Sequence, residues 1–196
     1  MLPILTFDER KLRPSYGYFF DRSWLAPYET IVGIAWKFAK MNVLPGHVVA
    51  QQLSVRPTDP YEGFAPILSN IDVRALATNF AIQKKALRVS IEPPDFSRRM
   101  SDHLRYCSRC MGLSYHGIMH QHAGTTRCPC HRTLIETACR GCGFVSEYRI
   151  TARLLNTPFR CPKCHRHYGR GYGPTQKLRP LPSDLRRAIT RARCGT

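Results

Sequence analysis

A small α-helical domain followed by two compact cysteine-rich modules, with little and irregular β structure, is the fold class that this sequence predicts. Three observations support it. All nine cysteines lie after residue 106, and most of them form regularly spaced pairs. Both tryptophans, Trp24 and Trp36, lie before that point, and Trp36 belongs to a segment with helical periodicity. The excess of positive charge is concentrated in the half that contains the cysteines.

Four short motifs in fewer than 60 residues carry most of the cysteines. They read Cys107-Ser-Arg-Cys110, Cys128-Pro-Cys-His131, Cys139-Arg-Gly-Cys142 and Cys161-Pro-Lys-Cys164. A tight turn with this spacing directs two soft donors at one ion, and two such turns complete a tetrahedron. The sequence therefore predicts two structural Zn²⁺ ions, the first held by Cys107, Cys110, Cys128 and His131, the second by Cys139, Cys142, Cys161 and Cys164.

Two details of the ligand sets stay open at this stage. A cross-braced arrangement, in which the first and third motifs share an ion, has compatible spacing. Cys130 could replace His131, although His131 keeps the spacing of the other three motifs. With four protein ligands at each ion there is no open position for water or substrate, so we expect metals that hold the fold and do no chemistry.

The beginning of the chain bears on whether the cysteines form disulfides. Residues 1–9 have no basic segment, only a short apolar run, and end in two acids, which is unlike a secretion signal. We therefore expect a cytoplasmic protein, where paired cysteines are better interpreted as metal ligands than as disulfides. No segment approaches the roughly 20 apolar residues that span a bilayer. No membrane partner is expected, with an anionic membrane surface kept as a weaker candidate than nucleic acid.

The charge distribution indicates a polyanionic partner. Residues 1–97 hold 11 basic and 9 acidic residues, a net +2, whereas residues 98–196 hold 19 and 4, a net +15. Seven ligand thiolates and two divalent ions would lower the second value to about +12. An excess of this size is typical of proteins that bind nucleic acid.

We expect four regions: an N-terminal extension over residues 1–26, a helical domain over 27–97, a tandem zinc-binding domain over 104–168 and a basic tail over 169–196. Apolar residues at helical steps predict a helix from near Thr30 that stops at Asn42, followed by a short helix after Pro45. Residues 56–66 are rich in proline and predict a loop.

Two further short helices, over residues 71–78 with Asn70 as the N-cap and over 82–87, surround a three-residue turn and suggest a helix-turn-helix. The tail should end in a marginal helix over 183–193 that orders on a partner. The candidate nucleic-acid-binding residues lie on the second of these short helices, in the second zinc module and in the tail: Gln83, Lys84, Lys85, Arg149, Arg153, Arg160, Lys163, Arg166, Arg170, Arg186 and Arg187. Phosphate contacts, a protein interface or a solvated face would use the same residue types.

The histidines between the first two motifs raise the question of catalysis. His116, His120 and His122 lie in a stretch with no Asp, Glu or Asn between Asp102 and Glu136. A histidine nuclease needs such a partner to bind a metal or position a base. We therefore expect no catalytic residues and no enzyme activity.

At this point the residues resemble the TniQ family. The segment Glu29-Thr-Ile-Val-Gly-Ile-Ala-Trp36-Lys-Phe-Ala39-Lys-Met-Asn42-Val-Leu44-Pro is similar to the opening helix of TniQ proteins, although Gly33-Ile34-Ala35 replaces the family's Ser-Trp-Leu core. The match is closer in Leu104-Arg-Tyr106-Cys107-Ser-Arg-Cys110, His120-Gln121 and Cys128-Pro129-Cys-His131, and Cys139 to Cys142 continues it. The similarity covers about residues 27–168, and the chain is close in size to the short TniQ of CRISPR-associated transposons.

The resemblance implies a non-catalytic accessory factor of DNA transposition. TniQ proteins link target recognition, by a CRISPR effector with its RNA or by a DNA-binding protein, to an AAA+ ATPase that recruits the transposase. The expected partners are therefore this ATPase, the targeting protein, DNA and possibly guide RNA. The alternatives are a zinc-ribbon transcription regulator, which would bind a defined DNA sequence alone, and, as the enzyme class, a zinc-dependent nuclease.

Overall fold

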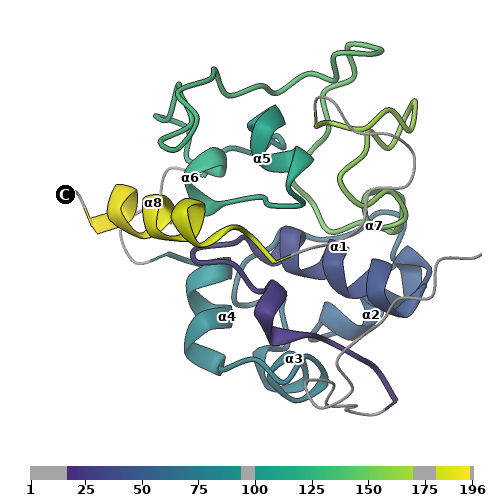
Figure 1. Cartoon of the computed structure of the whole chain (residues 1–196). Coiled ribbons are helices and arrows are strands. Elements are labelled where there is room, and N and C mark those ends of the chain that lie inside the picture. Colours follow the sequence, from purple (N-terminus) through teal and green to yellow (C-terminus); the bar gives the residue numbers. More distant parts are fainter. Residues whose placement is uncertain (1–16, 94–99, 170–179, 195–196) are drawn as a thin grey trace, which may run out of the picture.

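The computed structural model describes residues 17–93, 100–169 and 180–194, and within them it is mostly helical (Figure 1). The elements, in chain order, are η2 (Arg22–Trp24), α1 (Ile31–Asn42), α2 (Gly46–Leu53), α3 (Val73–Asn79), α4 (Lys84–Ile91), α5 (Ser108–Gly112), α6 (Ile118–Gln121), α7 (Ala152–Leu155) and α8 (Ser183–Cys194). Helices α1 to α4 form one side of the molecule, and the cysteine-rich segment forms the other. Helix α7 packs against α1 and α2.

Helix α1 is the central element of the helical half. The Thr30 side chain accepts a hydrogen bond from the Gly33 amide and caps the helix, and Val43 ends it in the left-handed conformation. Every residue from Ile31 to Ala39 is buried, as expected for a helix that is apolar on all sides. The predicted helix between Thr30 and Asn42 is confirmed.

Helices α3 and α4 pack against each other. They correspond to the pair of short helices that the sequence predicts. Their start differs from the prediction, because the N-cap is Asp72, whose carboxylate accepts hydrogen bonds from the amides of Arg74 and Ala75. Asn70 does not cap the helix; its side chain donates to the Ala65 carbonyl within the preceding loop. A DNA-reading role for the pair stays a prediction.

The β structure is as small and irregular as the sequence predicts. In the described ranges it consists of isolated antiparallel bridges, with no named strand. Two of these bridges, Glu29 with Gly117 and Phe64 with Ile150, connect the helical half to the cysteine-rich half.

The apolar core crosses the expected boundary between the two halves. One buried cluster contains α1 residues such as Trp36 together with Tyr106, Leu154 and Phe159 from the cysteine-rich half. The Trp36 indole also donates to the Leu154 carbonyl at 2.9 Å. The cysteine-rich half therefore depends on the helical half for much of its apolar packing.

Helix α8 packs on this chain's own surface. Leu181, Leu185 and Ile189 contact a second apolar cluster that includes Tyr115 and Cys128. The expectation that the tail helix needs a partner to order is therefore wrong for residues 183–194, because its apolar face is already covered.

No helix in the described ranges combines the length and the hydropathy that crossing a lipid bilayer requires.

Candidate metal centres

Two groups of four side chains converge in the cysteine-rich half, and they are the two sets that the motif spacing predicts. Within each group the ligand atoms all lie within 4.8 Å of one another: Cys107, Cys110, Cys128 and His131 form the first centre, and Cys139, Cys142, Cys161 and Cys164 form the second. The motifs thus pair in sequential order, and the cross-braced arrangement is not seen. Cys130 lies beside the first centre but does not belong to it.

The spacing of the ligand atoms fits a tetrahedral metal. In the first centre the Cys110 and Cys128 sulfurs are 3.7 Å apart, and His131 Nδ1 lies 3.2 Å from Cys110 Sγ. In the second, the Cys139–Cys164 and Cys142–Cys161 sulfur pairs are 3.6 Å and 3.7 Å apart. Zinc–sulfur bonds of about 2.3 Å in a tetrahedron give sulfur separations of about 3.8 Å. A disulfide would need about 2 Å.

One backbone hydrogen bond recurs in all four motifs. The amide that follows the second ligand donates to the carbonyl of the first ligand: Met111 to Cys107, Arg132 to Cys128, Gly143 to Cys139 and His165 to Cys161. In the last three motifs this residue is left-handed, with φ of 57°, 71° and 58°. In the second centre, the amides of Gly141 and Lys163 also donate to the sulfurs of Cys139 and Cys161.

The two centres differ in their exposure to solvent. All three cysteines of the first are buried and His131 is half-buried, whereas Cys142 and Cys164 of the second are exposed. The first centre is also enclosed by further side chains. The Thr133 hydroxyl lies 3.2 Å from Cys107 Sγ, and His120 Nε2 lies 3.8 Å from Cys128 Sγ. A metal in the second centre is therefore the more accessible to a competing chelator.

His116 connects the first module to the helical half. Its Nε2 lies 2.8 Å from the Arg105 carbonyl, which can only accept, so Nε2 carries the hydrogen. Nδ1 then accepts from the Thr30 hydroxyl at 2.7 Å, and that oxygen also accepts from Gly33 at the start of α1. Burial, together with the neighbouring His120, lowers the pKa of His116 to about 3. The ring is therefore a neutral structural link.

A buried ion pair that the sequence analysis did not identify joins Lys37 of α1 to Glu29, which lies just before the helix. Lys37 Nζ donates to Glu29 Oε2 at 2.8 Å and to the Trp24 carbonyl at 2.6 Å. Burial raises the pKa of Glu29 and lowers that of Lys37, and the attraction between the two opposes both shifts. Arg186 of α8 lies close enough to influence both groups and donates to the Leu25 carbonyl at 3.0 Å. The available sequence signal was a lysine within the apolar run from Ile31 to Ala39 of α1.

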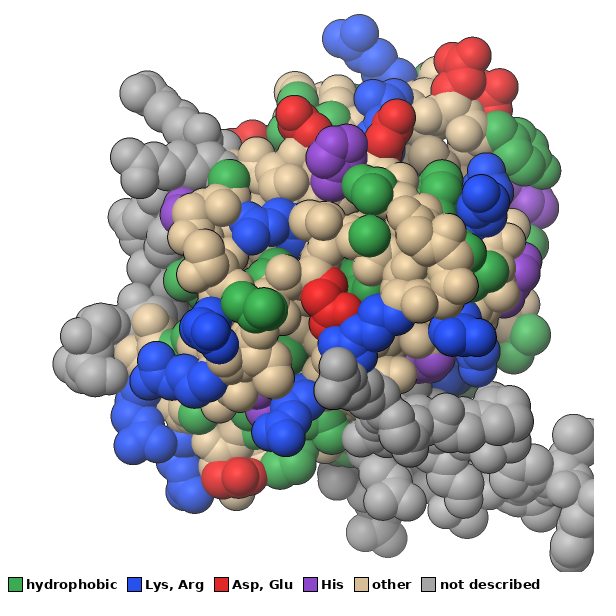
Figure 2. All heavy atoms as spheres, turned by 90° about the horizontal axis from the view of Figure 1, so that it is seen from above, with side chains coloured by type: hydrophobic (Ala, Val, Ile, Leu, Met, Phe, Trp, Pro, Cys, Tyr) green, Lys and Arg blue, Asp and Glu red, His purple; other side chains and the backbone are tan. Residues whose placement is uncertain are grey.

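The candidate nucleic-acid-binding residues do not form one surface. Gln83, Lys84 and Lys85 are exposed at the start of α4, in the helical half. Lys163 and Arg166 are exposed in the second module, and Arg187 is exposed on α8. Arg170 lies outside the described residues. Figure 2, which looks onto the face above the view of Figure 1, shows basic side chains with one denser group and acidic side chains between them.

Several of these arginines are engaged within the chain. Arg149 donates to the Gly63 carbonyl at 2.8 Å, Arg153 to Pro162 at 3.1 Å and Arg160 to His165 at 3.2 Å. Arg153 also lies over the Phe144 ring, 5.7 Å from its centroid. Arg153 and Arg160 therefore use part of their donor capacity within the second module, and Arg149 uses part of its own to join that module to the helical half.

In comparisons with known proteins, no protein-family model and no curated protein matches this chain.

Proposed function

We propose that this chain is a TniQ-like, non-catalytic accessory factor of DNA transposition, and that both centres hold structural Zn²⁺. Three cysteines with a histidine, and four cysteines, are donor sets typical of structural zinc. Each set supplies four ligands, so the ions would be closed to water and substrate.

The proposal is supported mainly by three residues of the TniQ-like motifs that are not metal ligands: Gln121, His120 and Tyr106. Gln121 donates to the carbonyls of Ser101 and His103 and accepts from the Arg105 amide. His120 accepts from the Gly117 amide and faces Cys128.

Tyr106, the third of these residues, is fully buried and donates to the Ala138 carbonyl, which lies between the two modules. The residues on which the resemblance rests therefore include side chains that shape the first module as well as metal ligands. This favours a shared motif over a chance repetition of ligand pairs.

In the proposed mechanism the chain is an adaptor. The helical half and the first module dock on an AAA+ ATPase, while the second module and α8 hold DNA or guide RNA close to it. Exposed Lys163, Arg166 and Arg187 would supply phosphate contacts, which position a nucleic acid without reading its sequence. The target-recognition partner would be a CRISPR effector or a DNA-binding targeting protein.

The test is co-purification of the metal-loaded protein with the AAA+ ATPase that the proposal expects to be encoded beside it, in the presence of ATP and DNA at low salt. We expect a complex that contains both proteins. Absence of association, with the metal content verified, would contradict the proposal. Tight binding of a defined DNA sequence by the chain alone would favour a transcription regulator instead.

A further inference from the structure

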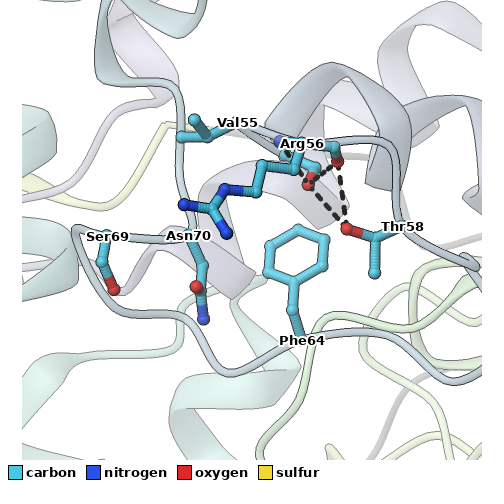
Figure 3. A pocket seen from close by; sticks show the side chains of 7 residues that line it. Val55, Arg56, Thr58, Phe64, Ser69 and Asn70 are labelled. Carbon is cyan, nitrogen blue, oxygen red and sulfur yellow. Dashed lines mark hydrogen bonds between the residues drawn. The ribbon is translucent and has the colours of Figure 1, made fainter.

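A polar pocket with an apolar floor lies in the helical half, away from both metal centres. It has a volume of about 320 Å³ and is formed by residues 54–58 and 64–70 (Figure 3). Its size is that of a cleft that takes one or two amino-acid side chains. Neither the metal centres nor the candidate nucleic-acid-binding residues contribute to it.

Hydrogen bonds hold the walls of this pocket in place. The hydroxyls of Ser54 and Thr58 both donate to the Arg56 carbonyl, at 2.6 Å and 3.0 Å. The Val55 amide donates to the Asn70 carbonyl at 3.0 Å, which joins the two segments. Phe64 exchanges backbone hydrogen bonds with Ile150, at 3.2 Å and 2.8 Å, and so fixes the floor. The pocket is therefore preformed.

Two of the polar groups that line the pocket make no hydrogen bond within the described residues. The Arg56 guanidinium makes no hydrogen bond or ion pair with any described residue, and neither does the Ser69 hydroxyl. In Figure 3 the Arg56 side chain reaches toward Asn70 and Ser69, with the Phe64 ring between Asn70 and Thr58. An unpaired guanidinium in a pocket that also holds a free hydroxyl is a ready site for a carboxylate or a phosphate.

The surroundings of the pocket favour a protein over a nucleic acid. Val55, Tyr61 and Ile67 are 51%, 71% and 43% exposed, and they are three of the seven large hydrophobic side chains exposed in the described residues. Val55 lines the pocket, and Tyr61 and Ile67 lie in the chain segments next to its lining residues; exposed apolar and aromatic groups near an arginine in the chain are typical of protein interfaces. Asp59 and Glu62 are exposed in the same loop and would repel a phosphate backbone.

We propose that this pocket docks an acidic segment of a partner protein. One carboxylate of the segment pairs with the Arg56 guanidinium and the Ser69 hydroxyl, and aliphatic side chains next to that carboxylate pack on Val55, Ile67 and the Phe64 ring. Asp59 and Glu62 would repel a run of negative charge, so the docked segment should carry a single carboxylate. This inference goes beyond the adaptor function and does not rest on it.

The test is selection of a phage-displayed random dodecapeptide library on the full-length, metal-loaded protein, followed by measurement of the affinity of each enriched peptide for the Arg56→Gln variant. We expect enriched peptides with one Asp or Glu flanked by aliphatic residues, and a loss of affinity of about tenfold or more in Arg56→Gln. Arg88→Gln is the matched control, because Arg88 is an exposed arginine of α4 outside the pocket. It should bind the peptides as the unsubstituted protein does.

A second measurement identifies the source of the anion. The Nε–Hε signal of Arg56, assigned by its loss in Arg56→Gln, is followed in NMR titrations with the best peptide, with inorganic phosphate and with oligo(dT). A shift with the peptide at the lowest concentration supports the proposal. A stronger response to oligo(dT), or enriched peptides that bind Arg56→Gln equally well, would overturn it.

Discussion

The Thr30 hydroxyl lies 2.7 Å from Nδ1 of His116, and the contact joins the first residue before α1 to the loop between the first two metal-binding motifs. The same hydroxyl caps α1 by accepting from Gly33. Because the Arg105 carbonyl fixes the ring from the other side, the helix start and the first module are held by one chain of hydrogen bonds. The helical half should therefore respond to changes in the first metal centre.

His116 should stay neutral at any pH at which the protein is folded. Its pKa of about 3 in the folded chain lies well below the ordinary value near 6.5. The folded state therefore gains stability that is fully present above pH 6.5 and is lost as the pH falls toward 3, by up to about 1.4 kcal/mol of unfolding free energy per pH unit. Long-range ¹H–¹⁵N NMR should show an unchanging Nε2–H tautomer between about pH 5 and 8, and a titration near pH 6.5 would refute this.

Thr30→Ala should destabilise the protein by about 1–2 kcal/mol, since it removes both the cap of α1 and the partner of His116 Nδ1. Chemical denaturation of the metal-loaded protein measures the change. Thr137→Ala is the control, because Thr137 is exposed and its hydroxyl makes no hydrogen bond with a described residue. Equal stability of the two variants would show that the Thr30–His116 contact contributes nothing.

The second centre should release its metal before the first. Cys142 and Cys164 are exposed, whereas the cysteines of the first centre are buried. Transfer of metal to a chromogenic chelator should therefore have two phases, and Cys164→Ser should remove the fast phase. Cys110→Ser should remove the slow one. A single phase, or the opposite assignment, would mean that burial does not control the exchange.

Ile189→Asp should undock α8, because Ile189 is buried against the apolar cluster beside the first centre. We expect hydrogen exchange of the α8 amides to accelerate by about tenfold or more, with the metal content unchanged. Arg187→Asp places a carboxylate on the exposed side of α8, with an even larger change in net charge, and should leave exchange nearly unaffected. Equal acceleration in the two variants would indicate that charge, and not packing, holds the helix.

The features that the sequence predicted correctly are local ones. The four motifs are turns of a few residues whose ligand spacing determines the geometry, and α1 has a capping threonine before an apolar run. The start of α3 was misplaced by two residues because Asn70 and Asp72 are equally suitable caps, and only the loop fold shows that the Asn70 amide donates to Ala65.

The features that could not be predicted depend on long-range contacts. Thr30 and His116 are 86 positions apart, and Arg186 contacts the Leu25 carbonyl across 161 positions. No periodicity or propensity reports such pairs. A count of positive charges likewise could not predict that Arg149 and Arg153 donate hydrogen bonds to backbone carbonyls.

Metal content, measured by native mass spectrometry before and after chelation, tests the central claim most directly. The two closed centres predict two zinc ions per chain, and removing both should unfold the cysteine-rich half, because structural zinc contributes about 10 kcal/mol or more to such modules. One ion or none in a folded protein, or a chain that keeps its fold without metal, would contradict the assignment of the eight ligands.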